Sequence, residues 1–177
     1  TPMVFTARLM KKKYPGCKVV FVGPCAAKKL EAIRADIRSD VDFVLTFEEL
    51  QGMFEAKEID FETIEPMYDL NEASAKGRGF AVSGGVAKAV EDMIHMTEPD
   101  LEVKTARAEG LRECRKLMTL AKAGKYKGYL LEGMACPGGC VAGAGTLLPV
   151  ELAANVVGRY QNEAQKESPL DSEYKDQ

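Results

Sequence analysis

The run Cys136-Pro137-Gly138-Gly139-Cys140 constrains the fold and chemistry of this chain more than any other feature. Two glycines between the cysteines allow a tight turn with close backbone approach, and the proline stiffens the start of that turn. The small residues Gly143, Ala144 and Gly145 follow and keep the surroundings free of bulk. A cluster needs several cysteine thiolates held close together, with backbone N–H groups directed at the sulfurs. The run therefore predicts an iron–sulfur cluster site.

Two other assignments of this loop stay open, although we favour neither. A zinc site normally shows two cysteine pairs, or cysteine with histidine at suitable spacing. The single histidine, His95, lies instead in a helical stretch. A disulfide or thiol pair is disfavoured because the chain has five cysteines, an odd number, and no secretory signal pattern, which together indicate a reducing compartment.

Cys25 is the expected third ligand of the cluster. It follows Pro24 at the end of a predicted strand, and Lys28-Lys29 come within one helical turn. Cationic side chains and a helix N-terminus lower the pKa of a thiol and favour its ligand form. A buried structural cysteine remains an alternative for this position. We expect Cys17 at the opposite end of the strand and Cys114 packed in the core.

Short β-rich runs alternate with helical patterns along the chain, which predicts an α/β fold with mostly parallel sheets flanked by helices. Strands are expected at 18–22, 42–45, 101–106 and 126–131, the first of them buried. Helices are expected near the N-terminus, at 26–34, from a capping box at 46–49 to residue 56, from 83–85 onward, at 111–123 and at 149–165. Both cysteine loops follow strands, so we expect them at a shared sheet edge, where ligands bind.

Composition excludes several classes of protein. Hydrophobic residues make up 46% and charged residues 29%, as in a soluble globular protein. The net charge of −3, with basic residues scattered along the chain, indicates no nucleic-acid partner, and no apolar run is long enough for a membrane span. We expect a cytoplasmic protein with one domain at 1–166, an irregular connection at 58–78 and a polar, mobile tail at 167–177.

With both loops placed, the sequence resembles the C-terminal domain of the iron-only hydrogenase large subunit. The segment 21–29, with Pro24-Cys25 and Lys28-Lys29, is similar to the second signature of that family. The segment 132–140, with Met134 and both loop cysteines, is similar to the third. Supporting stretches lie at 42–50 and 83–86, so that the resemblance extends over roughly residues 1–145.

The resemblance implies an H-cluster, which is a 4Fe–4S cubane joined through one cysteine sulfur to a diiron unit. Cys25 and Cys136 would then hold the cubane, and Cys140 would bridge it to the diiron unit. Lys28 would hydrogen-bond a cyanide, and Met134 would pack against the diiron unit. The implied reaction is the reversible reduction of protons to dihydrogen in an anaerobe, with a ferredoxin or a signalling domain of the parent chain as partner.

Two departures from the family limit this expectation. The first signature, which bears the remaining cubane cysteine, would lie upstream of Thr1, so we expect a domain truncated at its N-terminus, with an incomplete cluster and no activity by itself. Gly23 and the run 143–147 differ from the efficient enzymes and resemble sensory members, which implies redox or dihydrogen sensing. A non-catalytic 4Fe–4S module of the cluster assembly factor type is the alternative function, and a zinc or thiol-based structural domain is a third.

Overall fold

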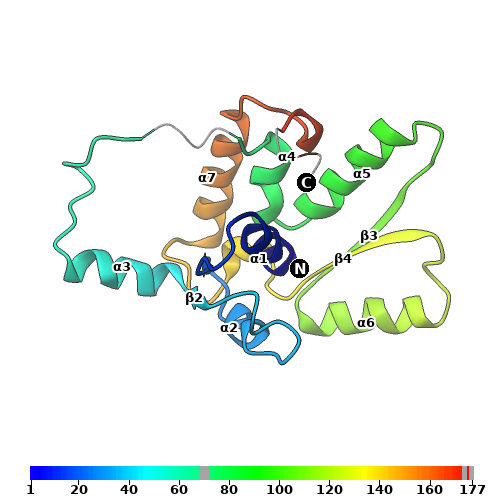
Figure 1. Cartoon of the computed structure of the whole chain (residues 1–177). Coiled ribbons are helices and arrows are strands. Elements are labelled where there is room, and N and C mark those ends of the chain that lie inside the picture. The colour runs from blue at the N-terminus through cyan, green and yellow to red at the C-terminus, as the bar shows by residue number, and fades with distance from the viewer. Residues whose placement is uncertain (68–71, 173–174, 176–177) are drawn as a thin grey trace. The chain divides into compact units, whose positions relative to one another are not determined.

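The computed structural model describes residues 1–67, 72–172 and 175, and the chain forms two compact units (Figure 1). Unit 1 comprises residues 1–66 together with 143–147. Unit 2 comprises the described residues of 67–142 and 148–175. The chain therefore passes from unit 2 into unit 1 between Ala142 and Gly143, directly after the cysteine loop, and returns after Leu147.

Unit 1 is built on a βαβ arrangement. Its elements are α1 (Pro2–Lys13), β1 (Val20–Val22), α2 (Ala27–Ala32), β2 (Phe43–Leu45) and α3 (Phe47–Ala56). Strands β1 and β2 pair in parallel, with Val20 opposite Phe43 and Val22 opposite Leu45. Parallel strands need a crossover connection, and α2 lies within it. The predicted parallel pairing is confirmed, although β1 is shorter than the expected 18–22.

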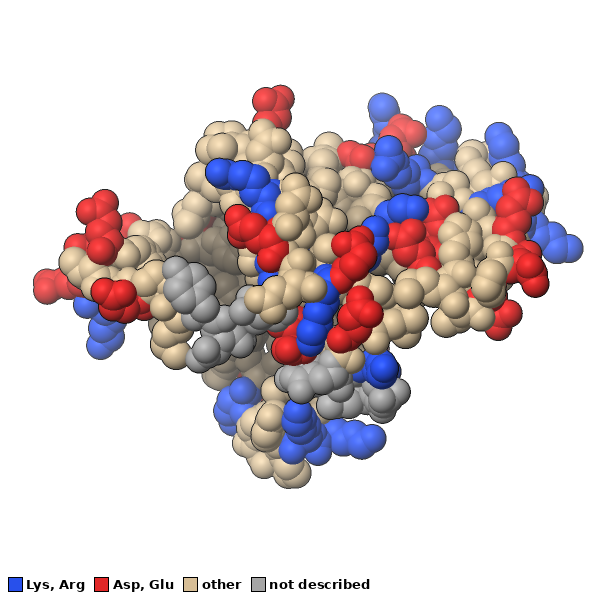
Figure 2. Space-filling view, turned by 90° about the horizontal axis from the view of Figure 1, so that it is seen from above, with Lys and Arg blue, Asp and Glu red and all other residues tan. Residues whose placement is uncertain are grey.

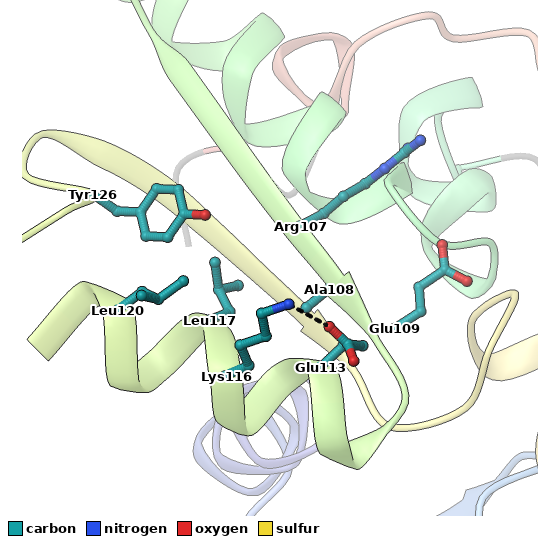
Figure 3. Close-up of a pocket in the computed structure, with 8 residues that line it drawn as sticks. All are labelled: Arg107, Ala108, Glu109, Glu113, Lys116, Leu117, Leu120 and Tyr126. Atoms are coloured by element: carbon teal, nitrogen blue, oxygen red, sulfur yellow. Dashed lines mark ion pairs between the residues drawn. The ribbon is translucent and has the colours of Figure 1, made fainter.

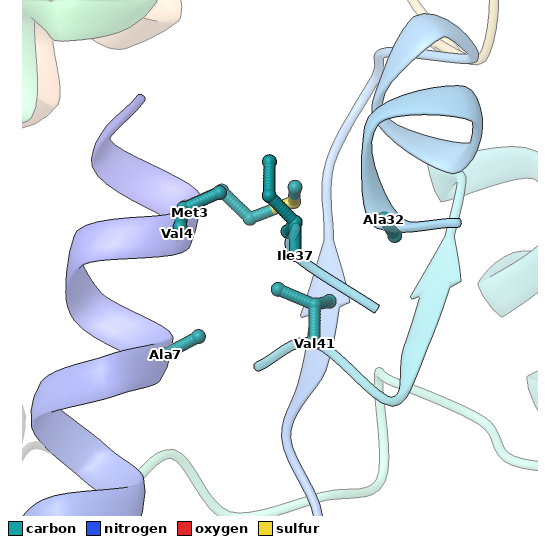
Figure 4. Packing of buried hydrophobic residues seen from close by; sticks show 6 residues of the cluster. All are labelled: Met3, Val4, Ala7, Ala32, Ile37 and Val41. Carbon is teal, nitrogen blue, oxygen red and sulfur yellow. The ribbon is translucent and has the colours of Figure 1, made fainter. Parts of the chain in front are cut away.

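The core of unit 1 lies between α1 and the segment from Ala32 to Val41, which precedes β2. Met3, Val4 and Ala7 form the buried stripe of α1, and they pack against Ile37 and Val41 (Figure 4). The spacing of three and four residues along α1 puts these side chains on one face of the helix. The helix expected near the N-terminus is confirmed, and Phe5 lies outside its buried stripe, at 66% exposed.

The other face of the β1–β2 sheet is exposed. Val20 is 48% exposed, Val22 38% and Phe43 62%, whereas Phe21 and Val44 pack against the core. The prediction of a fully buried first strand is therefore wrong. A continuous apolar run is typical of a strand that is buried on both faces of its sheet. Here only one face of the β1–β2 sheet is covered, so alternate residues of β1 are exposed.

The predicted capping box at the start of α3 is confirmed. The Thr46 hydroxyl accepts a hydrogen bond from the backbone N–H of Glu49, and the Glu49 carboxylate accepts one from the N–H of Thr46 at 2.8 Å. These bonds satisfy two N–H groups at the helix start. Helix α3 ends at Ala56, as expected.

Unit 2 holds a second βαβ arrangement. Its main elements are α4 (Ala75–Arg78), α5 (Gly85–Thr97), β3 (Lys104–Glu109), α6 (Leu111–Lys122), β4 (Tyr129–Met134) and α7 (Val150–Asn162). Short 3-10 helices lie at Gly79–Ala81 (η1), Cys140–Ala142 (η2) and Pro169–Asp171 (η3). Strands β3 and β4 pair in parallel, with Lys104 opposite Tyr129 and Glu109 opposite Met134. Helix α6 lies along one side of this sheet and α5 along the other (Figure 1).

Strands β3 and β4 each lie three residues later in the chain than expected, at both ends, and α7 ends at Asn162 instead of residue 165. Strand β3 begins at Lys104, because the N–H of Leu101 closes a turn on the carbonyl of Glu98. Strand β4 begins at Tyr129, because Gly128 has a φ of +80°, which a strand does not accommodate. Part of the expected irregular connection at 58–78 is helix α4, and residues 68–71 of that connection lie outside the described residues.

The segment expected as a polar tail starts with ordered packing. Ser168 is buried, and its hydroxyl accepts a hydrogen bond from the N–H of Leu170 at the start of η3. The same hydroxyl lies 3.4 Å from the sulfur of Met96 on α5. Positions 173–174 and 176–177 of this tail lie outside the described residues.

The surface carries charges of both signs. Acidic and basic side chains are spread over the face in Figure 2, in keeping with the small net charge of −3. Among the described helices, none combines the length and the apolar character that crossing a membrane would require.

Candidate functional site

The cysteine loop begins two residues after β4 ends, as the sequence predicts for a strand-to-loop junction. The N–H of Gly139 donates to the carbonyl of Cys136 at 3.0 Å, which closes a turn between the two cysteines. Cys140 then opens η2. Both cysteine side chains are half-buried, and all five cysteines of the chain are thiols.

The two glycines of the turn are required by its geometry. Gly138 has a φ of +94° and Gly139 a φ of +97°, a region that side chains with a Cβ rarely adopt. A Cβ on Gly139 would also lie 2.5 Å from the backbone nitrogen of Ser83. This close approach arises because Val82 and Gly139 form an isolated antiparallel bridge, and the N–H of Ser83 donates to the carbonyl of Gly138 at 3.1 Å.

Two carboxylates that sequence reasoning left without a role hold this arrangement. Glu109, the last residue of β3, accepts a 2.7 Å hydrogen bond from the backbone N–H of Gly138. Glu132 is 7% exposed and accepts a 3.2 Å hydrogen bond from the N–H of Gly84, next to the segment that meets the turn. In the sequence, the role of Glu109 is indicated only by the position of an acidic residue at the end of a strand.

The pKa of Glu109 lies below its ordinary value, mainly because the N–H of Gly138 donates to the carboxylate and next because the Ser83 side chain does, while the positive charge of Arg107 contributes further. Figure 3 shows both side chains on the side of β3 that faces away from α6. Glu109 is therefore an ionised acceptor at neutral pH, fixed at the centre of the cysteine turn.

A hollow of about 430 Å³ lies between α6 and the strands, and Arg107 and Glu109 are among the residues that line it (Figure 3). Its lining mixes the apolar side chains of Leu117 and Leu120 with the ion pair of Lys116 and Glu113, whose atoms lie 3.7 Å apart. No cysteine lines it. We therefore place the candidate site at the cysteine loop and not in this hollow.

Cys25 belongs to unit 1, where it follows β1, and its carbonyl accepts from the N–H of Lys28 at 3.2 Å. The ammonium of Lys28 pairs with Glu31 at 2.5 Å, and the hydroxyl of Thr1 donates to the same carboxylate at 2.8 Å. Partial burial is the largest influence on the Glu31 carboxyl and raises its pKa, but the hydrogen bonds from Lys28 and Thr1 together outweigh it. The pKa of Glu31 is therefore lowered.

The expectation of one shared sheet edge is wrong. Cys25 follows β1 of the β1–β2 sheet, whereas Cys136 follows β4 of the separate β3–β4 sheet. Both do follow the carboxyl ends of parallel strands, as predicted, but a strand pattern cannot tell how strands divide between sheets. Within residues 1–67, 72–172 and 175, no three histidine, cysteine, aspartate or glutamate side chains are gathered as a metal-binding group.

Cys114 has the packing role expected of it. Its sulfur lies 3.5 Å from the carbonyl oxygen of Ala108 on β3 and 3.5 Å from that of Met134 on β4. A Cβ on Gly133 would lie 3.4 Å from the same sulfur. The cysteine thus fills the contact between α6 and the sheet, beside the backbone of Met134, which also accepts a hydrogen bond from the N–H of Gly110 at 2.9 Å.

Comparison with known proteins gives this loop a family context. The family described as the C-terminal domain of the iron only hydrogenase large subunit matches residues 1–144. The periplasmic Fe hydrogenase large subunit of Nitratidesulfovibrio vulgaris is 29% identical, over 80% of this chain and 41% of its own length. A cytosolic Fe–S cluster assembly factor of Danio rerio is 30% identical, over 73% of this chain and 41% of its own length.

Solved structures agree with the fold. A variant of the FeFe-hydrogenase of Chlamydomonas reinhardtii matches 97% of this chain and 60% of its own with a TM-score of 0.58 and 20% identity. Another FeFe-hydrogenase structure reaches a TM-score of 0.68 at 21% identity, over 97% of this chain and 61% of that one. The chain thus spans about two fifths of the curated relatives above and about three fifths of these structures.

Proposed function

The chain belongs to the family of iron-only hydrogenase C-terminal domains, and we propose that it is the H-cluster-binding part of a hydrogenase-like protein. The observation that supports this most is the turn from Cys136 to Cys140, whose glycines have the backbone angles and the close contacts that only glycine allows. A turn fixed in this way keeps both thiols at one place, as a cluster needs.

The donor set fits an iron–sulfur group in its chemistry. Cys25, Cys136 and Cys140 are thiols that follow the carboxyl ends of parallel strands, and thiolates are the ligands that iron–sulfur clusters use. We propose that Cys25 and Cys136 hold the cubane and that Cys140 bridges to the diiron unit. When bound, the cluster supplies the electron transfer and proton reduction, and the protein supplies ligands and surroundings.

Two further side chains have proposed roles toward the diiron unit. The Lys28 ammonium has three N–H donors, of which Glu31 takes one, so the others are able to hydrogen-bond an anionic ligand such as cyanide. Met134, half-buried at the end of β4, is proposed to pack against the diiron unit. Protons and dihydrogen are the proposed reactants, with ferredoxin or a signalling domain as the electron partner and the cytoplasm as the location.

A sensory role is proposed over fast catalysis, on the basis of Gly23 and the segment 143–147. A Cβ on Gly23 would lie 2.8 Å from the ring of Phe21, so a side chain at this position does not fit without movement of that ring. A Cβ on Gly145 would likewise lie 2.4 Å from the Cβ of Thr46. The cluster assembly factor type is the second candidate, since a relative of that name is as similar as the hydrogenases.

Infrared spectroscopy of the complete parent protein, expressed with the hydrogenase maturation proteins, separates these functions. Cyanide and carbon monoxide bands are expected for an H-cluster. Iron and sulfide without these bands would favour the assembly factor type and overturn the H-cluster. A protein that takes up zinc but no iron would overturn both.

Cysteine variants of the same parent protein test the ligand set. Cys25→Ala, Cys136→Ala and Cys140→Ala are each expected to lose most of the cubane signal in electron paramagnetic resonance. Cys17→Ala and Cys114→Ala are the matched controls and are expected to keep the iron content. Equal iron loss in Cys114→Ala and Cys136→Ala would contradict the assignment.

A further inference from the structure

The hydrogen bond between Glu109 and Gly138 joins the end of one strand to the turn that follows its neighbour. Gly138 is two residues from each loop cysteine, so its Cα lies within about 7.6 Å of either cysteine Cα. Its N–H donates to Oε2 of Glu109 at 2.7 Å. Hydrogen bonds from backbone N–H groups to charged acceptors are among the stronger ones in proteins.

The acceptor of the Gly138 N–H is a carboxylate, and this bears on the charge near a bound cluster. In iron–sulfur sites, backbone N–H groups near the ligands ordinarily stabilise the negative charge on sulfur, and such hydrogen bonds raise the reduction potential. Here the central N–H of the turn is already occupied by a side chain that is itself negative. The lowered pKa of Glu109, caused mainly by the N–H of Gly138, keeps that side chain ionised.

The turn is also held by two hydrogen bonds in which Glu109 takes no part, although the Ser83 side chain is itself a hydrogen-bond partner of Glu109. The N–H of Ser83 donates to the carbonyl of Gly138 at 3.1 Å, and the buried Glu132 accepts from the N–H of Gly84 at 3.2 Å. Removal of the Glu109 carboxylate would therefore remove its bonds to Gly138 and Ser83, and it would leave the bonds from the N–H groups of Ser83 and Gly84 in place. This arrangement allows the contribution of Glu109 to be measured without loss of the whole loop.

We propose that Glu109 is a positioning residue for the turn from Cys136 to Cys140, and that its negative charge keeps the reduction potential of a cluster held there lower than a neutral residue would. The positioning role concerns the chain without a cluster. The effect on the reduction potential rests on the proposed function. An extra electron on the cluster is repelled by a nearby carboxylate, and for two charges about 10 Å apart at an effective dielectric constant of about 20 the effect is on the order of tenfold in the ratio of reduced to oxidised cluster.

Amide hydrogen exchange on the iron-free chain tests the positioning role. Glu109→Ala removes the acceptor and is expected to speed the exchange of the Gly138 N–H by about tenfold or more. Glu109→Gln retains an acceptor oxygen and should have a smaller effect. The control is Glu113→Gln, which removes a carboxylate of the same unit that pairs with Lys116 on α6. Unchanged exchange at Gly138 in Glu109→Ala, with the fold retained by circular dichroism, would overturn the positioning role.

Redox titration of the cluster in the complete matured protein tests the electrostatic role. Glu109→Gln is expected to raise the midpoint potential by about 59 mV, which is the tenfold ratio expressed for one electron, whereas Glu113→Gln leaves it near the wild-type value. An equal or lower potential in Glu109→Gln would overturn this role. A parent protein without any cluster would overturn the proposed function and the electrostatic role with it, while the exchange experiment decides the positioning role separately.

Discussion

The backbone N–H of Gly145 donates a 2.9 Å hydrogen bond to the carbonyl oxygen of Pro24. The segment that follows Cys140 in sequence is thereby bound, within unit 1, to the residue that precedes Cys25. The carbonyl of Gly145 in turn accepts a hydrogen bond from the N–H of Glu48 in the first turn of α3. The small residues after the cysteine loop thus have a structural use, since they let that segment approach closely.

Gly145→Ala is expected to destabilise unit 1 by about 1–3 kcal/mol, because the added Cβ would lie 2.4 Å from the Cβ of Thr46. Urea unfolding followed by circular dichroism measures the change. Gly52→Ala is the matched control, since no atom lies within 4 Å of its added Cβ in the middle of α3. That variant should gain about 0.5–1 kcal/mol through helix propensity. If the two variants shifted in the same direction, the close packing of Gly145 would be contradicted.

Gly139→Ala tests the cysteine turn in the same way. Its φ of +97° and the 2.5 Å approach to the Ser83 nitrogen predict a cost of about 2–4 kcal/mol, since backbone atoms cannot move aside as a side chain does. The control in unit 2 is Gly158→Ala, a site on α7 with no atom within 4 Å of the added Cβ. Unfolding midpoints in urea should fall for the first variant and rise slightly for the second. A midpoint for Gly139→Ala equal to wild type would show that the turn adapts.

Local signals in the sequence predicted the elements well, for identifiable physical reasons. The capping box at Thr46 and Glu49 is satisfied by its own residues, and the positions of apolar residues in α1, α5 and α6 depend only on helix periodicity. The glycines of the cysteine turn also act locally, through their backbone angles. These features need no knowledge of what packs against them.

Features that depend on partners distant in sequence were not predictable. The division of the strands into two sheets, with Cys25 after a strand of one and Cys136 after a strand of the other, is decided by pairing between strands and has no signature within one strand. The exposure of Val20 and Val22 depends on which face α1 covers. The bond between Glu109 and Gly138 spans 29 positions, so nothing in either segment alone indicates it.

Ile37→Ala probes the core of unit 1. Ile37 is 6% exposed and packs with Met3 and Val4, so truncation leaves a cavity and should cost about 2–4 kcal/mol. Ile33→Ala is the control, because Ile33 is 71% exposed and its loss should change stability by less than about 0.5 kcal/mol. Thermal or urea unfolding of the two variants gives the comparison. Similar values for both would mean that Ile37 is not part of the core.

The carboxylate of Asp42 predicts a specific dependence of stability on pH. Its pKa lies far below the ordinary range, first because the Lys11 ammonium donates to it at 2.8 Å and next because the N–H of Val19 does so at 2.8 Å. A carboxyl whose folded pKa is depressed stabilises the fold above its unfolded pKa, and this contribution is lost as pH falls toward the folded pKa.

Asp42→Asn should therefore weaken the loss of stability between about pH 5 and about pH 2, a range that begins just above the ordinary aspartate pKa. Urea midpoints at several pH values measure this slope. Lys11→Gln removes the first of the donors and should reduce the slope as well, since the pKa of Asp42 then rises toward its ordinary value. A slope in Asp42→Asn as steep as in the wild type would assign the acid sensitivity to other carboxylates with lowered pKa, of which Glu31 and Glu49 lie in the same unit.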